Sequence, residues 1–136
     1  MKILGRHLLA EYAHCNPHPL SNRAMLEQIM KEAVRKSGAT MVDAVFHQYN
    51  PQGLSGVIVI AESHISIHTW PEYNFASVDC YTCGTHADPW KAIKYLKKAL
   101  GCEKLQVTEH NRGIPSEVDE VIAHKPMIPT SIGVSQ

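Results

Sequence analysis

The segment over residues 57–70 constrains the fold more than any other part of this 136-residue chain. Residues 57–60 are all apolar and β-branched, which is typical of a strand at the centre of a sheet. From Ser63 onward polar and apolar side chains alternate, and successive side chains of a strand point to opposite faces. One face would carry His64, Ser66, His68 and Trp70, and the other Ile65, Ile67 and Thr69. The segment therefore predicts two consecutive strands, the second with one buried and one polar face.

The rest of the chain alternates between strand and helix signals. A turn is expected over residues 16–19, followed by a helix that Ser21 or Asn22 caps and that Gly38 ends. Asp88 predicts the cap of a second helix, which would end at Gly101. The remaining strands are expected over residues 2–12, 40–49, 75–83 and 104–110.

This order, β-α-β-β-β-β-α-β, predicts an α+β fold. We expect a two-layer sandwich in which two helices cover one face of a mainly antiparallel sheet. The other face then needs cover of its own. A second copy of the chain packed there, an active-site cleft, or both would supply that cover.

Length and charge restrict the possible partners. The 136 residues are expected to form a single domain. Thirteen basic and thirteen acidic side chains give no overall field for nucleic acid or for an acidic membrane. No apolar run reaches the roughly 18 residues that a membrane helix needs. Four cysteines without a secretion signal favour free thiols and a cytoplasmic location.

Reactive side chains gather around Ser63, and three interpretations were open. The side chains could be strand residues that only pack. They could instead bind zinc through His64, His68, Cys80 and Cys83. A regular strand sends residues three apart, such as Cys80 and Cys83, to opposite faces, which argues against zinc.

The third interpretation makes Ser63 a nucleophile. It lacks the Gly-x-Ser-x-Gly elbow of a hydrolase, since its surroundings read IAESHI. The electrophile nearest to it along the chain is the carbonyl of Glu62.

The sequence resembles the short prokaryotic S-adenosylmethionine decarboxylase proenzymes. The motifs that carry the resemblance are ESHISIHTWPE at residues 62–72 and YTCG at 81–84, supported by GRHL at 5–8, SGAT at 37–40 and DPWKA at 88–92. The similarity covers residues 1 to about 113.

The resemblance implies a chain that cuts itself between Glu62 and Ser63. Attack of the Ser63 hydroxyl on the Glu62 carbonyl would convert the amide to an ester. Elimination and hydrolysis would then leave a pyruvoyl group at residue 63, with residues 1–62 as the β chain and 63–136 as the α chain. This covalent group would be the cofactor, and no metal is expected.

The resemblance also implies the roles of individual residues. His68 would act as the base in processing, and Ser55, expected in a loop over residues 52–56, would assist it. The pyruvoyl group would form a Schiff base with the substrate amine, and Cys83 would return a proton after CO2 leaves. Trp70 and Tyr49 would stack on the adenine or face the sulfonium cation, and Glu72 would accept the ribose hydroxyls.

As a member of this group, the chain would decarboxylate S-adenosylmethionine to the aminopropyl donor for spermidine biosynthesis. It would form a homodimer of αβ units and need no diamine activator. Two alternatives stay open from the sequence: a pyruvoyl enzyme that prefers arginine, and a zinc-binding module that is not an enzyme.

Overall fold

The structure, a computed structural model, describes residues 3–61 and 63–118. Its elements are β1 (Gly5–Ala13), α1 (Pro17–Ser21), α2 (Arg23–Ser37), β2 (Met41–Gln48), β3 (Leu54–Ile60), β4 (Ser63–Trp70), the 3-10 turn η1 (Pro71–Tyr73), β5 (Phe75–Cys83), α3 (Pro89–Ala99) and β6 (Lys104–Arg112). The strands form one sheet in the order β2-β3-β4-β5-β1-β6, and every neighbouring pair is antiparallel. The predicted α+β class is therefore confirmed.

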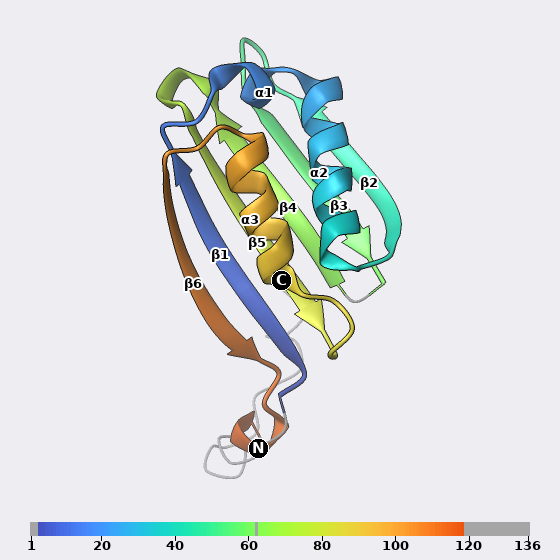
Figure 1. Cartoon of the computed structure of the whole chain (residues 1–136). Coiled ribbons are helices and arrows are strands. Elements are labelled where there is room, and N and C mark those ends of the chain that lie inside the picture. The colour runs from blue at the N-terminus through green and yellow to red at the C-terminus, as the bar shows by residue number, and fades with distance from the viewer. Residues whose placement is uncertain (1–2, 62, 119–136) are drawn as a thin grey trace, which may run out of the picture.

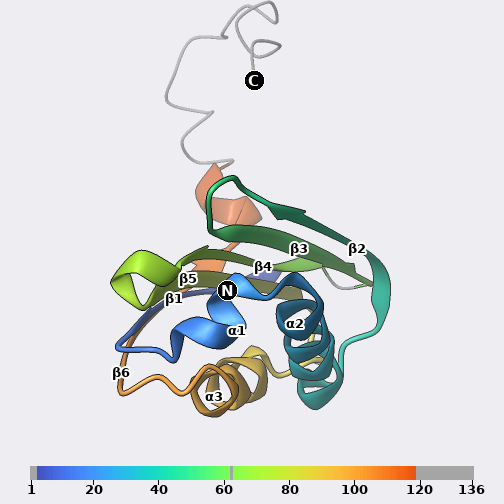
Figure 2. The ribbon, with the colours of Figure 1, turned by 90° about the horizontal axis from the view of Figure 1, so that it is seen from above.

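Helices α1, α2 and α3 all lie on one side of the sheet. Figure 1 shows α2 and α3 side by side across it, and Figure 2 shows α1 in the same layer. Among residues 3–61 and 63–118, no helix or strand covers the opposite face, which we call the open face. No helix in these ranges is long and apolar enough to span a membrane.

The core lies between the sheet and the helices. Ile65 and Ile67 of β4 are fully buried there, whereas His68 and Trp70 of the same strand are exposed. This is the alternation that the sequence predicted. Removing this apolar surface from water provides most of the driving force for the two-layer arrangement. The largest fully buried side chains are Tyr12, Leu8, Leu20, Leu26, Met30, Leu54, Ile58, Ile65, Ile67, Ile93, Leu96 and Leu100.

Side-chain caps set the ends of the two long helices. Of the two cap candidates, Asn22 begins α2 by accepting a hydrogen bond from Met25 N at 3.0 Å. Asp88 does the same for α3, accepting from Trp90 N at 3.0 Å. Gly38 ends α2 in the left-handed conformation at φ +83°, where a side chain would be strained.

Two boundaries differ from the expectation. The segment predicted as a turn contains α1, because the Asn16 side chain accepts from His18 N and Pro17 occupies the first helical position. The same residues that favour a turn thus start a short helix. The first strand begins at Gly5, and residue 2, where it was expected to begin, lies outside the described residues.

A third difference changes the position of Ser55, which was expected in a loop. Strand β3 begins at Leu54, so Ser55 lies within the sheet between His47 and His68. The next residue, Gly56, allows this because the Phe46 ring packs directly over it. A β-carbon at Gly56 would lie 2.2 Å from Phe46 Cε2.

Candidate active site

Ser63 is the first residue of β4 and lies at one end of the sheet. It pairs with Ile60 of β3 and with Thr82 of β5, so its α-carbon is held on both sides. Cys83 follows Thr82 and is half-buried at the same end. Glu62, the other half of the predicted cleavage site, lies outside the described residues. Two of the predicted catalytic residues, Ser63 and Cys83, are therefore close neighbours in the sheet.

Ser55 and His68 meet at the opposite end of the same strands. They are paired in the β3–β4 ladder, and Ser55 Oγ lies 2.8 Å from His68 Nδ1. When Nδ1–H donates to the serine, Nε2 keeps a free lone pair and can accept a proton. The pair thus has the geometry of a base with an orienting partner.

The predicted substrate residues gather around this pair. A cleft of about 360 Å³ is lined by Tyr49, Gln52, Gly53, Leu54, Ser55, His68, Thr69, Trp70 and Glu72. Tyr49 is 50% exposed and Trp70 39% exposed, so both rings have free surface for stacking. The structure brings together all three predicted substrate residues and the two predicted processing residues.

One chain nevertheless does not bring all the predicted residues into one site. Ser63 and His68 are five positions apart on a continuous strand, which separates their α-carbons by about 16 Å. Their side chains also belong to opposite faces of the sheet. The His68 ring therefore cannot reach Ser63 of its own chain in this structure.

Thr82 carries an unpaired polar atom beside Ser63. Its side chain is 1% exposed, and Oγ1 has no hydrogen-bond partner among the residues that the structure describes. Cross-strand neighbours place their β-carbons about 5 Å apart, so this hydroxyl can reach atoms around residue 63. A free donor at that point can form a hydrogen bond to a new carbonyl oxygen or oxyanion at residue 63. The surroundings of this residue therefore suit a pyruvoyl group.

A polar cluster on the open face was not predicted from the sequence. Asp79 Oδ2 lies 2.6 Å from His7 Nε2 and 2.9 Å from His64 Nε2, and Ser66 donates to Oδ1. Burial alone raises the pKa of Asp79, but the hydrogen bonds from Ser66, His7 and His64 outweigh it, and the net pKa is lowered. Alternation placed each residue on a face, but the cross-strand register that joins them is not visible in the sequence.

The cluster has the residue types of a metal site, but its hydrogen bonds argue against that role. Arg112 Nη1 lies 2.8 Å from His7 Nδ1 and can only donate, so the His7 proton resides on Nε2, which faces Asp79. A histidine that binds metal through Nε2 needs an acceptor at Nδ1 instead.

The four residues weighed for zinc do not come together either. Cys80 is 2% exposed in the core between sheet and helices, away from His64, and burial raises the pKa of its thiol to about 12. Its predicted packing role is consistent with this position.

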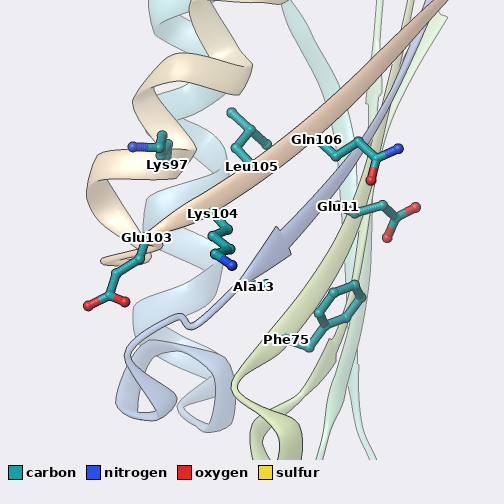
Figure 3. A pocket seen from close by; sticks show the side chains of 8 residues that line it. All are labelled: Glu11, Ala13, Phe75, Lys97, Glu103, Lys104, Leu105 and Gln106. Carbon is teal, nitrogen blue, oxygen red and sulfur yellow. The ribbon is translucent and has the colours of Figure 1, made fainter.

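A larger hollow of about 710 Å³ lies around the edge strand β6, away from the predicted residues. Figure 3 shows Glu11 and Gln106 pointing to one side of the strand and Glu103 to the other. The side chains do not converge on a common point. We therefore place the candidate site at the smaller cleft, where the lining groups suit the chemistry.

The fold and the cleft define a class: a small α+β protein whose candidate active-site residues lie on the open face and at the strand ends of one antiparallel sheet. Comparison with known proteins then gives the family. The family model described as S-adenosylmethionine decarboxylase matches residues 6–113. The chain belongs to the S-adenosylmethionine decarboxylase family.

Individual relatives agree with this result. The chain is 52% identical over 118 residues to the S-adenosylmethionine decarboxylase proenzyme of Thermotoga petrophila, covering 87% of this chain and 91% of that one. It is 46% identical over 114 residues to the proenzyme of Caldicellulosiruptor saccharolyticus, covering 84% and 92%. The crystal structure of the adenosylmethionine decarboxylase from Aquifex aeolicus matches with a TM-score of 0.79 and 34% identity, over 84% of this chain and 94% of that chain.

Proposed function

We propose that this chain is a self-processing, pyruvoyl-dependent S-adenosylmethionine decarboxylase. The observation that supports this most is that the cleft holding Tyr49, Trp70 and Glu72 also holds the Ser55–His68 pair. Substrate recognition and proton transfer would thus share one site. The family to which the chain belongs indicates that the substrate is S-adenosylmethionine.

In the proposed processing reaction Ser63 is consumed. Its Oγ attacks the carbonyl of residue 62, the peptide C–N bond breaks, and an ester links the two parts. The side chain of a His68, which Ser55 holds in the correct tautomer, then removes the Ser63 α-proton. Elimination then releases the carboxylate of residue 62 and leaves dehydroalanine at residue 63, whose imine tautomer reacts with water to give the pyruvoyl group and ammonia. The products are a β chain of residues 1–62 and an α chain of residues 63–136.

The pyruvoyl ketone supplies an electron sink for the pair of electrons that the departing CO2 leaves behind. The group would form at residue 63, at the start of β4, with Cys83 close by on β5. The Cys83 thiol would deliver a proton to the substrate α-carbon after decarboxylation.

The substrate would be held by its nucleoside half. The exposed faces of Tyr49 and Trp70 suit the adenine ring and the sulfonium cation, by stacking and cation–π attraction. The Glu72 carboxylate, in the same cleft, can accept hydrogen bonds from both ribose hydroxyls. Nucleoside recognition of this kind favours S-adenosylmethionine over arginine.

The proposed active form is a homodimer with composite sites. A two-fold axis near the middle of β4 would bring the Ser63 end of one chain to the His68 end of its partner. The separation of about 16 Å between the Ser63 and His68 α-carbons within one chain supports such an arrangement. Packing open face on open face would also exclude water from the exposed cleft.

In the cell we expect this enzyme in the cytoplasm, where its product would be the aminopropyl donor for spermidine biosynthesis. The proposed reaction uses the pyruvoyl group, without a metal and without a diamine activator.

A side-by-side assay of carboxyl-labelled substrates tests the proposal. Labelled CO2 should be released from S-adenosylmethionine at least a hundredfold faster than from arginine, because the site bonds to groups that arginine lacks. Borohydride treatment should abolish the activity by reducing the ketone. Preference for arginine, or activity that resists borohydride, would contradict the proposal.

A further inference from the structure

Among the residues that the structure describes, the Thr82 hydroxyl is buried without a hydrogen-bond partner, and it lies next to the residue at which cleavage is proposed. Leaving a buried polar group unpaired costs folding free energy, and such groups are rare in native proteins. The side chain is 1% exposed and sits directly across the β4–β5 ladder from Ser63. The cost would be compensated if the hydroxyl gained a partner during the reaction.

We propose that Thr82 is a catalytic residue of self-cleavage, whose hydroxyl donates to the oxyanion that forms when Ser63 attacks the preceding carbonyl. In that step the C–Oγ bond forms, the carbonyl π electrons move to the oxygen, and the Oγ proton leaves to the base. The peptide C–N bond breaks when the oxyanion collapses, the departing nitrogen of residue 63 takes the proton from the base, and Thr82 is unchanged. A donor that is unpaired in the ground state and paired in the transition state accelerates the reaction directly.

The inference rests on the proposed function and names a further residue for it. Substitution Thr82→Val keeps the shape and removes the donor, and Thr82→Ser keeps the donor. Cleavage of newly synthesised chain, followed by denaturing electrophoresis over time, should slow about a hundredfold in Thr82→Val and recover to within about tenfold of wild type in Thr82→Ser.

Thermal unfolding separates a chemical role from a structural one. Measured on uncut chains that also carry Ser63→Ala, Thr82→Val should melt at the same temperature or higher, because the unpaired hydroxyl is gone. Wild-type cleavage rates in Thr82→Val, or a lower melting temperature without rescue by serine, would overturn the inference. A wild-type chain that stays intact would overturn the proposed function as well.

A different observation concerns two cysteines that lie beside each other at the far end of the sheet. Cys15 follows β1, and Cys102 lies between α3 and β6. Next to them Asn16 N donates to Leu100 O at 2.9 Å. Two antiparallel segments of the chain are thus held together at this point.

Further contacts lie on the other side of Cys15 and Cys102. Glu103 N donates to Ala13 O at 3.3 Å. Cys102 Sγ lies 2.7 Å from Lys104 O and 3.3 Å from Ala13 O, and Cys15 Sγ lies 3.5 Å from Tyr12 O. Both sulfur atoms therefore lie at the same end of β1, next to carbonyl groups of adjacent residues.

We infer that Cys15 and Cys102 form a disulfide when a peroxide is present. One sulfur takes an oxygen atom from hydrogen peroxide to give a sulfenic acid and water, and the second thiol displaces water to form the S–S bond. Burial first, and the neighbouring Cys102 second, raise the pKa of the Cys15 thiol to about 12, so oxidation should be slow and faster at higher pH.

The bond would have a consequence for a processed chain, which rests on the proposed function. Cys15 lies in the 1–62 fragment and Cys102 in the 63–136 fragment. The disulfide would therefore join the two fragments covalently after the cut at residue 62.

Electrophoresis of the full chain, treated with hydrogen peroxide and then alkylated, tests this inference. Without reductant the fragments should migrate as one band, and dithiothreitol should separate them. Cys102→Ser should give two bands in either condition, whereas the matched control Cys80→Ser should behave like wild type.

Peptide mapping of the uncut Ser63→Ala chain makes the test independent of processing. The peptides that contain residues 15 and 102 should be joined and lighter by two hydrogen atoms. Separate alkylation of both thiols after peroxide treatment would overturn the inference.

Discussion

At the scale of single residues, Ser55 fixes the orientation of His68 through one exposed hydrogen bond. We predict that Ser55→Ala slows self-cleavage about tenfold to a hundredfold, because the imidazole loses the partner that selects its tautomer. The free energy of unfolding should change by less than about 0.5 kcal/mol, since the bond is exposed. A gel time course measures the first quantity and urea denaturation the second.

A matched control is available on the same face. Ser77→Ala removes a serine of β5 that lies directly across the ladder from His68 but donates its hydrogen bond to Glu11. It should leave the cleavage rate unchanged. Equal slowing in both variants would show that Ser55 has no specific role.

The lowered pKa of Asp79 predicts that the free energy of unfolding depends on pH. Because hydrogen bonds lower its pKa in the folded state, the carboxylate stabilises the fold above the unfolded value of about 3.9. This contribution is lost as the pH falls from about 5 through the folded pKa. Urea midpoints measured between pH 6 and pH 3 should therefore fall more steeply for wild type than for Asp79→Asn, and parallel curves would contradict the prediction.

The reactive residues of the motif could be predicted from the sequence, but two of their neighbours could not. The alternation around Ser63 assigned His68 and Trp70 to the polar face, and the structure agrees. Thr82 and Asp79 gained their importance from the β4–β5 register, which pairs Thr82 with Ser63, 19 positions away, and Asp79 with Ser66, 13 positions away. A lone threonine or aspartate within a strand gives no such signal.

At the scale of elements, the start of β3 depends on the contact between Phe46 and Gly56. We predict that Gly56→Ala lowers the free energy of unfolding by about 2 kcal/mol, because the new methyl group would overlap the ring. Urea denaturation measures the loss.

A double-mutant cycle identifies the cause. With Phe46→Leu already in place, Gly56→Ala should cost at least about 1 kcal/mol less than in the wild-type background. Additive effects would mean that the overlap with Phe46 is not the source of the loss.

This contact also explains why the sequence misplaced Ser55. Residues 50–56 contain proline, two glycines and a serine, a composition that usually forms loops. Packing of a ring from the adjacent strand makes extended structure favourable there, and this is a tertiary effect. Similarly, α1 is too short for a periodic apolar pattern, and only its Asn16 cap could have indicated it.

At the scale of the whole molecule, the separation of Ser63 from His68 makes a prediction about subunit exchange. Chains carrying Ser63→Ala and chains carrying His68→Ala should each be inactive. Produced together, they should recover about a quarter of wild-type activity, because half of the dimers are mixed and each mixed dimer has one complete site.

The recovered activity should come with cleavage of the His68→Ala chain alone, since its Ser63 meets His68 of the partner subunit. Sites built within one chain would give no recovery at any mixing ratio.

The most direct test of the central claim is the intact mass of the purified full-length chain under denaturing, reducing conditions. We predict two chains, residues 1–62 with an ordinary carboxyl end, and residues 63–136 with a mass that corresponds to pyruvoyl in place of serine. Ser63→Ala should give one uncut chain. A single wild-type chain of full mass, or cleavage that persists in Ser63→Ala, would contradict the account.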